Sequence, residues 1–414
     1  MHPIPARHLL VAGALLVLTN GPVFYIANRV LENGQSWEEP FTRAVFVSVA
    51  LVAFAAVALD RFRLDGVRLA PQSLVASAAI IGFAGWALLS SLWSLSPEIT
   101  RGRSLIYVGL AALAWIIADL DFRDFRRALV VASFGAVALS VVAVVLSEAV
   151  GTDKNDDWRG VFTNRNSLAP IAGVALITGI SLMIDSHGRR RVAVAVIPIV
   201  SGVTMLNSGS RTASFAVLVA SGAALLVVAA KIGGDRFGPR ARWGCAAAGL
   251  AGGAVTMVVI RQLWGEPTFI QRRTIWSFVW DRVAERPLHG FGWFNVWSDP
   301  EFISADPLLG RGSAHGSFLE VWLGLGLVGL LPFLVIVGLA LYGTVTAAWK
   351  RPSIASWTWL ALVLFLVIEN LTESFVLWFS YNWVLLMVAA LKSGVGRRRA
   401  AEPGRHEPSE LANA

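Results

Sequence analysis

The chain has 414 residues, of which 56% are hydrophobic and 15% are charged, and its mean hydropathy is +0.63. These values exclude an ordinary soluble globular protein and indicate an integral membrane protein. The formal net charge of +8 is explained by the membrane topology argued below, and it gives no reason to expect a nucleic-acid partner.

Apolar segments recur along the chain at lengths suited to crossing a membrane. About 17 to 25 apolar residues are needed to span a hydrocarbon core of roughly 30 Å as a helix. Backbone polar groups cannot stay unpaired in lipid, so these segments must be helical. We predict an all-α polytopic fold with about twelve transmembrane helices, centred near Val17, Val49, Ile81, Leu110, Val137, Val174, Val200, Leu218, Gly252, Leu331, Leu362 and Leu385.

The basic residues predict the orientation of these helices. Most of the 35 Lys and Arg residues fall in alternate connecting segments, which by the positive-inside rule lie in the cytoplasm together with both termini. The first apolar stretch lacks a small-residue cleavage site, so we expect a retained helix. The single cysteine, Cys245, allows no intramolecular disulfide.

Three regions follow from this topology. Residues 1–150 form a transmembrane scaffold of five helices with little polar chemistry. Residues 151–393 form a second transmembrane region that carries the polar motifs, including a long outer loop at 261–314. Residues 394–414 form a basic cytoplasmic tail, expected to be disordered and attracted to anionic lipid.

Two acidic groups invite a metal interpretation. Asp153, Asp156 and Asp157 lie in the outer loop before the helix near Val174, and their oxygens could bind a divalent cation. Their spacing matches no recognised site, so we favour a solvated turn. Asp119 and Asp121 stand beside Arg123, Arg126 and Arg127, where charge neutralisation is the simpler role. We therefore predict no metal and no cofactor.

Two arginines stand at the outer ends of predicted helices. Arg165 precedes N-S-L-A-P, and Arg211 follows the tight turn N-S-G-S. Guanidinium groups bind phosphate oxygens in bidentate fashion, and free N–H groups at a helix N-terminus add to the attraction. The pair predicts an anion site, and interfacial snorkelling is the alternative. Arg101 and Arg103, in another outer connection, fit interfacial anchors better than substrate contacts.

The long loop carries a second pair of arginines. Residues 271–284 are expected to form a short amphipathic helix at the membrane interface that holds Arg272 and Arg273. The following R-P-L-H-G-F-G-W-F-N is rich in turns, with Gly290 and Gly292 allowing tight bends. Its histidine, His289, fits a structural role among aromatic residues.

His315 is the strongest catalytic candidate. It lies in S-A-H-G-S at the point where the next transmembrane helix begins, and an ionisable residue at such a depth suggests function. Histidine side chains titrate near neutral pH. Glu320 is five residues on, about 140° around a helix, so it need not orient His315. Glu369 and Glu373, at the outer end of a later helix, could line the same cavity or be boundary carboxylates.

These motifs, in this order, resemble the O-antigen ligase and O-antigen polymerase superfamily of bacterial membrane glycosyltransferases. The resemblance rests on G-V-F-T-N-R-N-S-L-A, N-S-G-S-R-T-A, R-P-L-H-G-F-G-W-F-N and S-A-H-G-S-F-L-E-V-W-L-G-L-G-L-V-G-L. One departure is Gly316, which follows the histidine where the family often has asparagine, and it leaves the substrate subtype open.

The resemblance implies an inner-membrane enzyme that works on the periplasmic side. It implies transfer of a glycan from undecaprenyl diphosphate to the hydroxyl of an acceptor glycan or glycolipid, such as lipid A-core, without metal. It also implies that Arg211, with Arg165 or one of Arg272 and Arg273, binds the diphosphate and that His315 acts at the acceptor hydroxyl. In-line attack with His315 as general base would invert the anomeric centre.

Two alternatives stay open at this stage. A polysaccharide polymerase would use a second lipid-linked glycan as acceptor, and the sequence does not separate it from a ligase. A transporter or flippase of lipid-linked glycan could also have twelve helices. Transporters tend to carry ionisable residues near the midplane and internal repeats, whereas the polar groups here gather at one face. The sequence therefore favours an enzyme.

Overall fold

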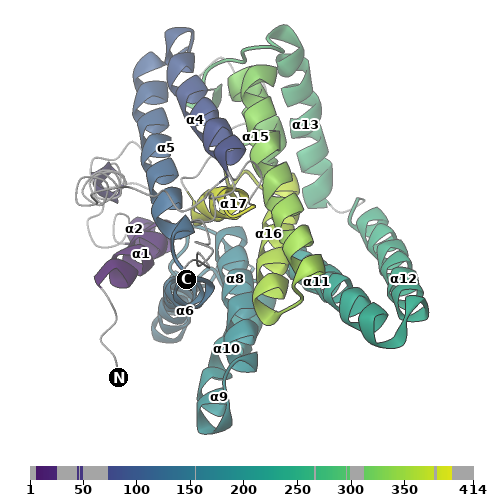
Figure 1. Ribbon diagram of the computed structural model, residues 1–414. Helices are drawn as coiled ribbons and strands as arrows, with labels where there is room; N and C mark the ends of the chain where they lie inside the picture. Colours follow the sequence, from purple (N-terminus) through teal and green to yellow (C-terminus); the bar gives the residue numbers. More distant parts are fainter. Residues whose placement is uncertain are drawn as a thin grey trace, which may run out of the picture.

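The computed structural model describes residues 6–25, 44–45, 47–49, 73–153, 155–264, 267–294, 296–298, 312–376 and 380–393. Every regular element in these ranges is a helix (Figure 1), and the one isolated β-bridge among them joins Thr152 to Trp158. The prediction of an all-α polytopic fold is confirmed. The expected tail at 394–414 and much of the loop at 261–314 lie outside the described residues.

The helices follow one another with short connections. In the first half of the chain they are α1 (Ala6–Val17), α2 (Gly21–Tyr25), α4 (Leu74–Leu89), η2 (Ser90–Leu92), α5 (Pro97–Ala118), α6 (Phe122–Leu146), α7 (Glu148–Gly151), α8 (Arg165–Ile184), α9 (Gly188–Val194) and α10 (Val196–Asn207). In the second half they are α11 (Arg211–Phe237), α12 (Pro239–Trp264), α13 (Pro267–Glu285), η3 (Val296–Ser298), α15 (Ser317–Lys350), α16 (Ile354–Thr372) and α17 (Tyr381–Leu391).

Among the described residues, eight helical segments are long and apolar enough to cross a membrane. They are Leu74–Leu92, Pro97–Ala118, Phe122–Leu146, Arg165–Ile184, Gly188–Asn207, Arg211–Phe237, Ser317–Lys350 and Ile354–Thr372. The helices at the predicted centres Val17 and Leu385 are shorter, and most of the segment around Val49 lies outside the described residues. The number of crossings therefore stays a prediction.

The helices that carry the predicted site residues begin or end at one end of the bundle. A Cβ atom at Gly173 of α8 would meet Phe365 of α16 at 2.7 Å and Val217 of α11 at 2.8 Å, so these three positions lie at one level. From that level α8 and α11 run back to their first residues, whereas α16 runs forward to its last. Since Glu373 also contacts His315, which precedes α15, we call this end of the bundle the site end.

Aromatic side chains join the N-terminal helices to the C-terminal ones. Phe83 of α4 contacts Trp293 of the long loop with ring centroids 5.6 Å apart and Trp383 of α17 at 5.2 Å. Phe333 of α15 stacks on Trp383 at 5.5 Å. All four rings are buried. The first region is thus a scaffold that the second region is built on.

The long loop is fixed to this scaffold by its own backbone. The hydroxyl of Thr100 donates to the carbonyl of Trp293 at 3.1 Å, and the Trp293 N–H donates to Ser90 Oγ at 3.0 Å. Arg103 donates to the carbonyl of Phe294 at 2.6 Å and covers the Phe294 ring at 4.0 Å. Arg103 is therefore an anchor for the loop, in line with the interpretation favoured from the sequence.

Helix α15 is broken where the same loop crosses it. Gly326 has φ 65° and ψ −170°, which interrupts the helix between Leu325 and Leu327. The N–H groups of Leu327 and Val328 donate to the carbonyls of Pro287 and Leu288, at 2.8 and 3.2 Å. The N–H groups of Phe291 and Gly292 donate back to α15, to Leu323 and Gly324. The loop and the broken helix thus satisfy each other's backbone groups.

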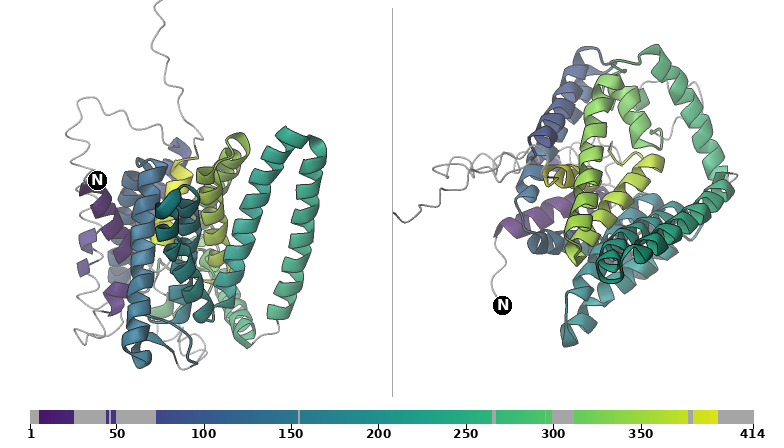
Figure 2. Two further views of the ribbon diagram at one scale, coloured as in Figure 1. Left: turned by 90° about the horizontal axis from the view of Figure 1, so that it is seen from below. Right: turned by 45° about the vertical axis from the view of Figure 1, so that its right-hand side comes forward.

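Helix α12 lies at the edge of the molecule. It runs beside α11 and is exposed over nearly its whole described circumference (Figure 2), and α13 then returns to lie against α15 (Figure 1). Helix α13 spans the amphipathic segment predicted at 271–284, and it buries Ile275, Val279 and Val283 on one face. This return brings the arginine pair of the loop back to the site end.

Candidate functional site

His315 stands in the turn immediately before α15, as the sequence predicted. Its φ is 49°, in the left-handed region that a residue with a side chain seldom adopts. The residues on either side hold this conformation: Trp276 Nε1 donates to the carbonyl of Ala314 at 2.8 Å, and the Gly316 N–H donates to Ser374 Oγ at 3.0 Å. A strained backbone fixed from several directions is typical of functional positions.

Glu320 supports the same turn from below. Its carboxylate accepts hydrogen bonds from the Ala314 N–H, from Trp297 Nε1 at 2.9 Å and from Ser374 Oγ at 3.0 Å. The side chain is buried, and it does not line the cavity described below. Glu320 therefore holds the backbone that carries His315, although it does not contact the imidazole ring.

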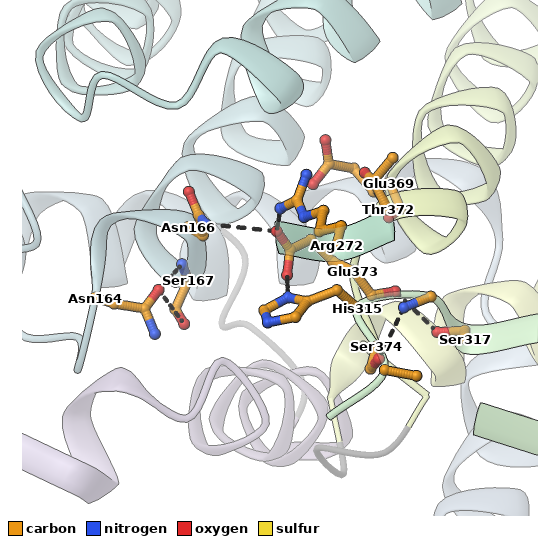
Figure 3. Close-up of polar contacts among 12 residues, drawn as sticks. Asn164, Asn166, Ser167, Arg272, His315, Ser317, Glu369, Thr372, Glu373 and Ser374 are labelled. Carbon is orange, nitrogen blue, oxygen red and sulfur yellow. Dashed lines mark hydrogen bonds and ion pairs between the residues drawn. The ribbon is translucent and has the colours of Figure 1, made fainter. Parts of the chain in front are cut away.

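Glu373 connects His315 to Arg272. The His315 Nδ1 atom lies 3.2 Å from Glu373 Oε2, and the other carboxylate oxygen accepts from Arg272 Nη2 and, at 3.4 Å, from Asn166 Nδ2 (Figure 3). The side chains of Arg272 and Glu373 are only 11% and 13% exposed. Three segments distant in sequence, α13, the turn before α15 and the end of α16, therefore meet at one carboxylate.

This contact fixes the tautomer of the imidazole. An ionised carboxylate can only accept hydrogen bonds, so Nδ1 carries the hydrogen when it bonds to Glu373. The other ring nitrogen, Nε2, then has a free lone pair. Figure 3 shows the ring turning that edge away from Glu373, on the side of Asn164 and Ser167. An imidazole held in this way can act as a general base.

Glu369 lies one turn before Glu373 on α16. It is 1% exposed, and its Oε1 atom has no hydrogen-bond partner among the described residues. Its carboxyl group lies within electrostatic range of both Arg272 and Glu373 (Figure 3). The Arg272 guanidinium therefore serves two acidic neighbours, of which Glu373 makes the direct ion pair.

A cavity of about 510 Å³ opens beside His315. His315 and Glu373 line it together with the first turn of α8, the turn between α1 and α2, and the first residues of α17. Thirteen of its eighteen lining residues are polar, and Leu18, Phe162, Ile171 and Phe375 provide apolar surface. Its volume falls in the range of roughly 300–1,000 Å³ typical of small-molecule sites.

The structure separates the two arginines of the predicted loop pair. Arg272 is buried and paired to Glu373, whereas Arg273 is exposed on the surface of α13. Successive residues of a helix differ by about 100° in direction, so only one of two neighbours can face the bundle. Arg272 is the one that reaches the site.

Arg165 and Arg211 lie at the site end, outside the contacts of His315. Arg165 is the first residue of α8, and its guanidinium pairs with Asp157. Arg211 is the first residue of α11, six residues or about 9 Å beyond the level of Val217, and its side chain is exposed. Neither lines the cavity beside His315. Both remain candidates for an anion approaching from the rim.

The acidic loop before α8 is an ordered turn. Asp153 Oδ1 accepts from the N–H groups of Asn155 at 2.8 Å and of Asp157 at 3.3 Å, and the Trp158 N–H donates to the carbonyl of Asn207. The loop is thereby attached to the turn before α11. Asp153 and Asp157 have structural partners, as the turn interpretation expected.

His289 also has a structural role. Its ring is exposed and meets Trp93 edge-on at 5.9 Å, and its carbonyl accepts from Trp93 Nε1 at 3.2 Å. The neighbouring Gly290 has φ 65°, and a Cβ atom there would lie 2.6 Å from the backbone of Gly324. The motif around His289 thus shapes α15 and does not reach the cavity.

Several residues of the site were missed from the sequence. Asn166 and Ser374 contact Glu373 and the turn of His315, and Asn382 and Tyr381 line the cavity. Asn and Ser are common at helix ends, where they cap backbone groups, so nothing in their local pattern distinguishes them. The signal that could have found Asn166 was its place beside Arg165 in N-R-N-S.

Comparison with protein families supports the grouping of these motifs. Residues 193–334 match the family described as O-antigen ligase, a stretch that runs from α10 into α15 and includes Arg211, Arg272 and His315. The match covers about a third of the chain and ends before Glu373. No curated protein sequence matches the chain.

The family indicates a ligase-like or polymerase-type function on glycans, carried out by a glycosyltransferase-like membrane protein. The resemblance noted from the sequence motifs is thereby confirmed over the part of the chain that holds the histidine and three of the four candidate arginines. Residues 193–334 place this protein in the O-antigen ligase superfamily.

Proposed function

We propose that this protein is a glycosyltransferase of the inner membrane that transfers a glycan from undecaprenyl diphosphate to an acceptor hydroxyl on the periplasmic side. Both termini would then lie in the cytoplasm, as the distribution of Lys and Arg predicts. The observation that carries the proposal is the chain from Arg272 through Glu373 to His315 beside a polar cavity.

The arginines provide the donor side of the reaction. Diphosphate is already a good leaving group, and the protein has mainly to neutralise the charge that grows as it departs. Arg272 uses one Nη2 contact for Glu373 and keeps other N–H donors of its fork. Arg211 and Arg165, at helix N-termini of the same end, would add charge at the rim, where free backbone N–H groups also favour an anion.

His315 provides the acceptor side. With its Nδ1 hydrogen directed to Glu373, the Nε2 lone pair can take the proton of a hydroxyl in the cavity. As that proton moves to His315, the oxygen attacks the anomeric carbon and the bond from that carbon to the phosphate oxygen breaks. The electron pair of the broken bond stays on the diphosphate. Glu373 stabilises the imidazolium that forms.

Direct attack by the acceptor predicts inversion at the anomeric carbon. The new bond forms on the face opposite the leaving diphosphate, because no enzyme-bound glycan intervenes. In this scheme the positive charge that a metal ion would supply to a departing diphosphate comes from arginine. We therefore propose a metal-independent, inverting transfer.

A polymerase is the second candidate, and it would use the same donor site and base. The difference lies in the acceptor, which would be a second lipid-linked glycan in place of lipid A-core. The cavity beside His315 supports either acceptor, since its polar lining suits any neutral sugar. A transporter is less well supported, because a histidine directed by a buried carboxylate has no evident use in passing a glycan across the membrane.

A reconstituted transfer assay tests the proposal. The purified protein in lipid is given an undecaprenyl-diphosphate-linked oligosaccharide with lipid A-core, or without added acceptor, beside the variants His315→Ala and Arg211→Ala. Transfer to lipid A-core that both variants lose would support a ligase, and a ladder of longer lipid-linked chains would support a polymerase. Full activity of His315→Ala, or retention of anomeric configuration, would refute the mechanism.

A further inference from the structure

The cavity beside His315 has two halves of different chemistry. On one side it holds His315 and Glu373, and on the other it holds carboxamides and hydroxyls from α8, α17 and the turn after α1. The carboxamides are those of Asn20, Asn164, Asn166 and Asn382. Carboxamide and hydroxyl groups both donate and accept hydrogen bonds, which matches the alternating donors and acceptors of a sugar ring.

The cavity lacks the charge needed for a phosphate. None of its lining residues is an arginine or a lysine, and Arg165, Arg211 and Arg272 are all outside the lining. Its only carboxylate, Glu373, is directed to His315 and Arg272. An anion would therefore gain little by entering, whereas an uncharged polyol would meet polar partners on most sides.

Two buried groups in the cavity wall have unmet hydrogen-bonding capacity. Tyr381 and Asn382 are each 1% exposed, and among the described residues neither the Tyr381 hydroxyl nor Asn382 Oδ1 has a hydrogen-bond partner. Leaving such a group unsatisfied in the protein interior costs about 1–3 kcal/mol. Unsatisfied groups are rare in folded proteins, and a site for a ligand is one reason to keep them.

These observations converge on one assignment. We propose that the cavity is a saccharide subsite for the acceptor, in which Tyr381 and Asn382 bind hydroxyls of the sugar whose nucleophilic oxygen faces His315. The assignment rests on the proposed glycosyl transfer and deepens it by naming the acceptor pocket. The donor sugar has to stay next to its diphosphate, and hence next to the arginines, so it belongs outside this cavity.

The position of His315 supports this arrangement. It lines the cavity and contacts Glu373 on the opposite edge of its ring, with Asn164 and Ser167 facing the free edge (Figure 3). An acceptor sugar bound between α8 and α17 would thus present one hydroxyl to Nε2. Attack would then proceed outward from the cavity, toward a diphosphate held by Arg272 and the rim arginines.

Binding of lipid-free oligosaccharides gives a test that does not depend on catalysis. The protein in lipid nanodiscs is titrated calorimetrically with core oligosaccharide released from lipopolysaccharide and, separately, with a free O-antigen repeat. One of the two is expected to bind, which also distinguishes a ligase from a polymerase. Undecaprenyl diphosphate without a glycan should not displace it, and competition between the two would overturn the assignment.

Tyr381→Phe is the sharpest variant, because it removes only a hydroxyl that has no partner in the unliganded protein. We expect the Kd of the oligosaccharide to rise roughly five- to tenfold, the effect of one hydrogen bond. Asn382→Ala should act in the same direction. Tyr342→Phe is the matched control, since Tyr342 is 57% exposed on α15 and distant from the cavity lining, and its Kd should stay unchanged.

Kinetics then separate this proposal from the proposed function. Tyr381→Phe should raise the KM of the acceptor by a similar factor and leave the KM of the donor unaltered. If the wild-type protein transfers glycan but Tyr381→Phe keeps the wild-type acceptor KM and Kd, the subsite is refuted and the function stands. If oligosaccharide binds as described while no acceptor is ever glycosylated, the function fails and the saccharide site stands.

Discussion

His315 and Glu373 stand 58 residues apart in the chain and meet with Nδ1 and Oε2 separated by 3.2 Å. The first belongs to the turn that opens α15 and the second caps the end of α16. Ser317 Oγ reinforces the junction by donating to Asn370 Oδ1 at 2.5 Å and to the carbonyl of Glu373 at 3.2 Å. The carboxylate therefore has a defined place from which to orient the imidazole.

Replacing Glu373 by glutamine tests this orientation. An amide can present an N–H group to Nδ1, which favours the wrong tautomer of His315, and it carries no charge to stabilise the imidazolium. Loss of such an orienting partner typically costs about 10- to 100-fold. We expect kcat to fall by that factor, with the acceptor KM nearly unchanged, in the reconstituted transfer assay.

Glu285→Gln is the matched control for this change. Glu285 pairs with Arg282 at 3.0 Å on the exposed part of α13, where a single surface ion pair contributes little to stability. Its kcat should equal that of the wild type. A Glu373→Gln enzyme that also turns over at the wild-type rate would show that His315 needs no carboxylate partner.

The two neighbouring arginines of α13 provide a second, internally controlled comparison. Lysine keeps the charge of arginine and loses its bidentate fork. Arg272→Lys should therefore raise the donor KM about tenfold or more and lower the thermal stability of the protein, because Glu373 loses a buried partner. Arg273→Lys, at the exposed position, should leave both quantities near their wild-type values. Equal effects of the two substitutions would contradict the assignment of Arg272 to the site.

Removal of metal ions tests the proposed role of the arginines. If guanidinium groups supply the charge that stabilises the departing diphosphate, dialysis against EDTA should leave the transfer rate unchanged. A sugar-nucleotide transferase that requires Mg²⁺, treated in parallel, should lose its activity and so verify the chelation. A rate that falls with EDTA and returns with Mg²⁺ would show that the arginines do not suffice.

The fold was largely predictable because membrane-spanning helices are written in the chain as long apolar runs. The centres near Ile81, Leu110, Val137, Val174 and Leu331 each fall within one long helix of the structure. The number of crossings was harder to predict, since α12 has the length of a span yet is absent from the eight apolar segments. Length and hydropathy indicate helices more reliably than they count crossings.

The site was predictable only in part, because its geometry depends on which helices meet. The position of His315 at the start of a helix followed from its neighbours, and so did the helix that carries Arg272. That Glu373, and neither Glu320 nor Glu369, would contact the imidazole required the packing of α15 against α16. Local sequence does not determine such a contact, since all three glutamates lie near the ends of apolar segments.

The break in α15 gives a last prediction, on stability. At Gly326 φ is 65°, and a Cβ atom there would lie 2.2 Å from the backbone of Leu288, which no rotation of a side chain can relieve. Left-handed geometry alone costs a non-glycine residue about 1–2 kcal/mol, and the clash adds to it. Gly326→Ala should therefore lower the unfolding temperature in detergent and displace the turn that carries His315, with loss of transfer activity.

Gly338→Ala separates this effect from the general consequence of adding a methyl group to α15. Nothing lies within 4 Å of a Cβ atom at Gly338, and the residue is exposed in a regular part of the helix. Alanine is favoured over glycine there by roughly 0.5–1 kcal/mol, so this variant should be as stable as the wild type or slightly more stable. A Gly326→Ala protein with the same unfolding temperature would mean that the loop at 287–292 does not cross α15 at this close distance.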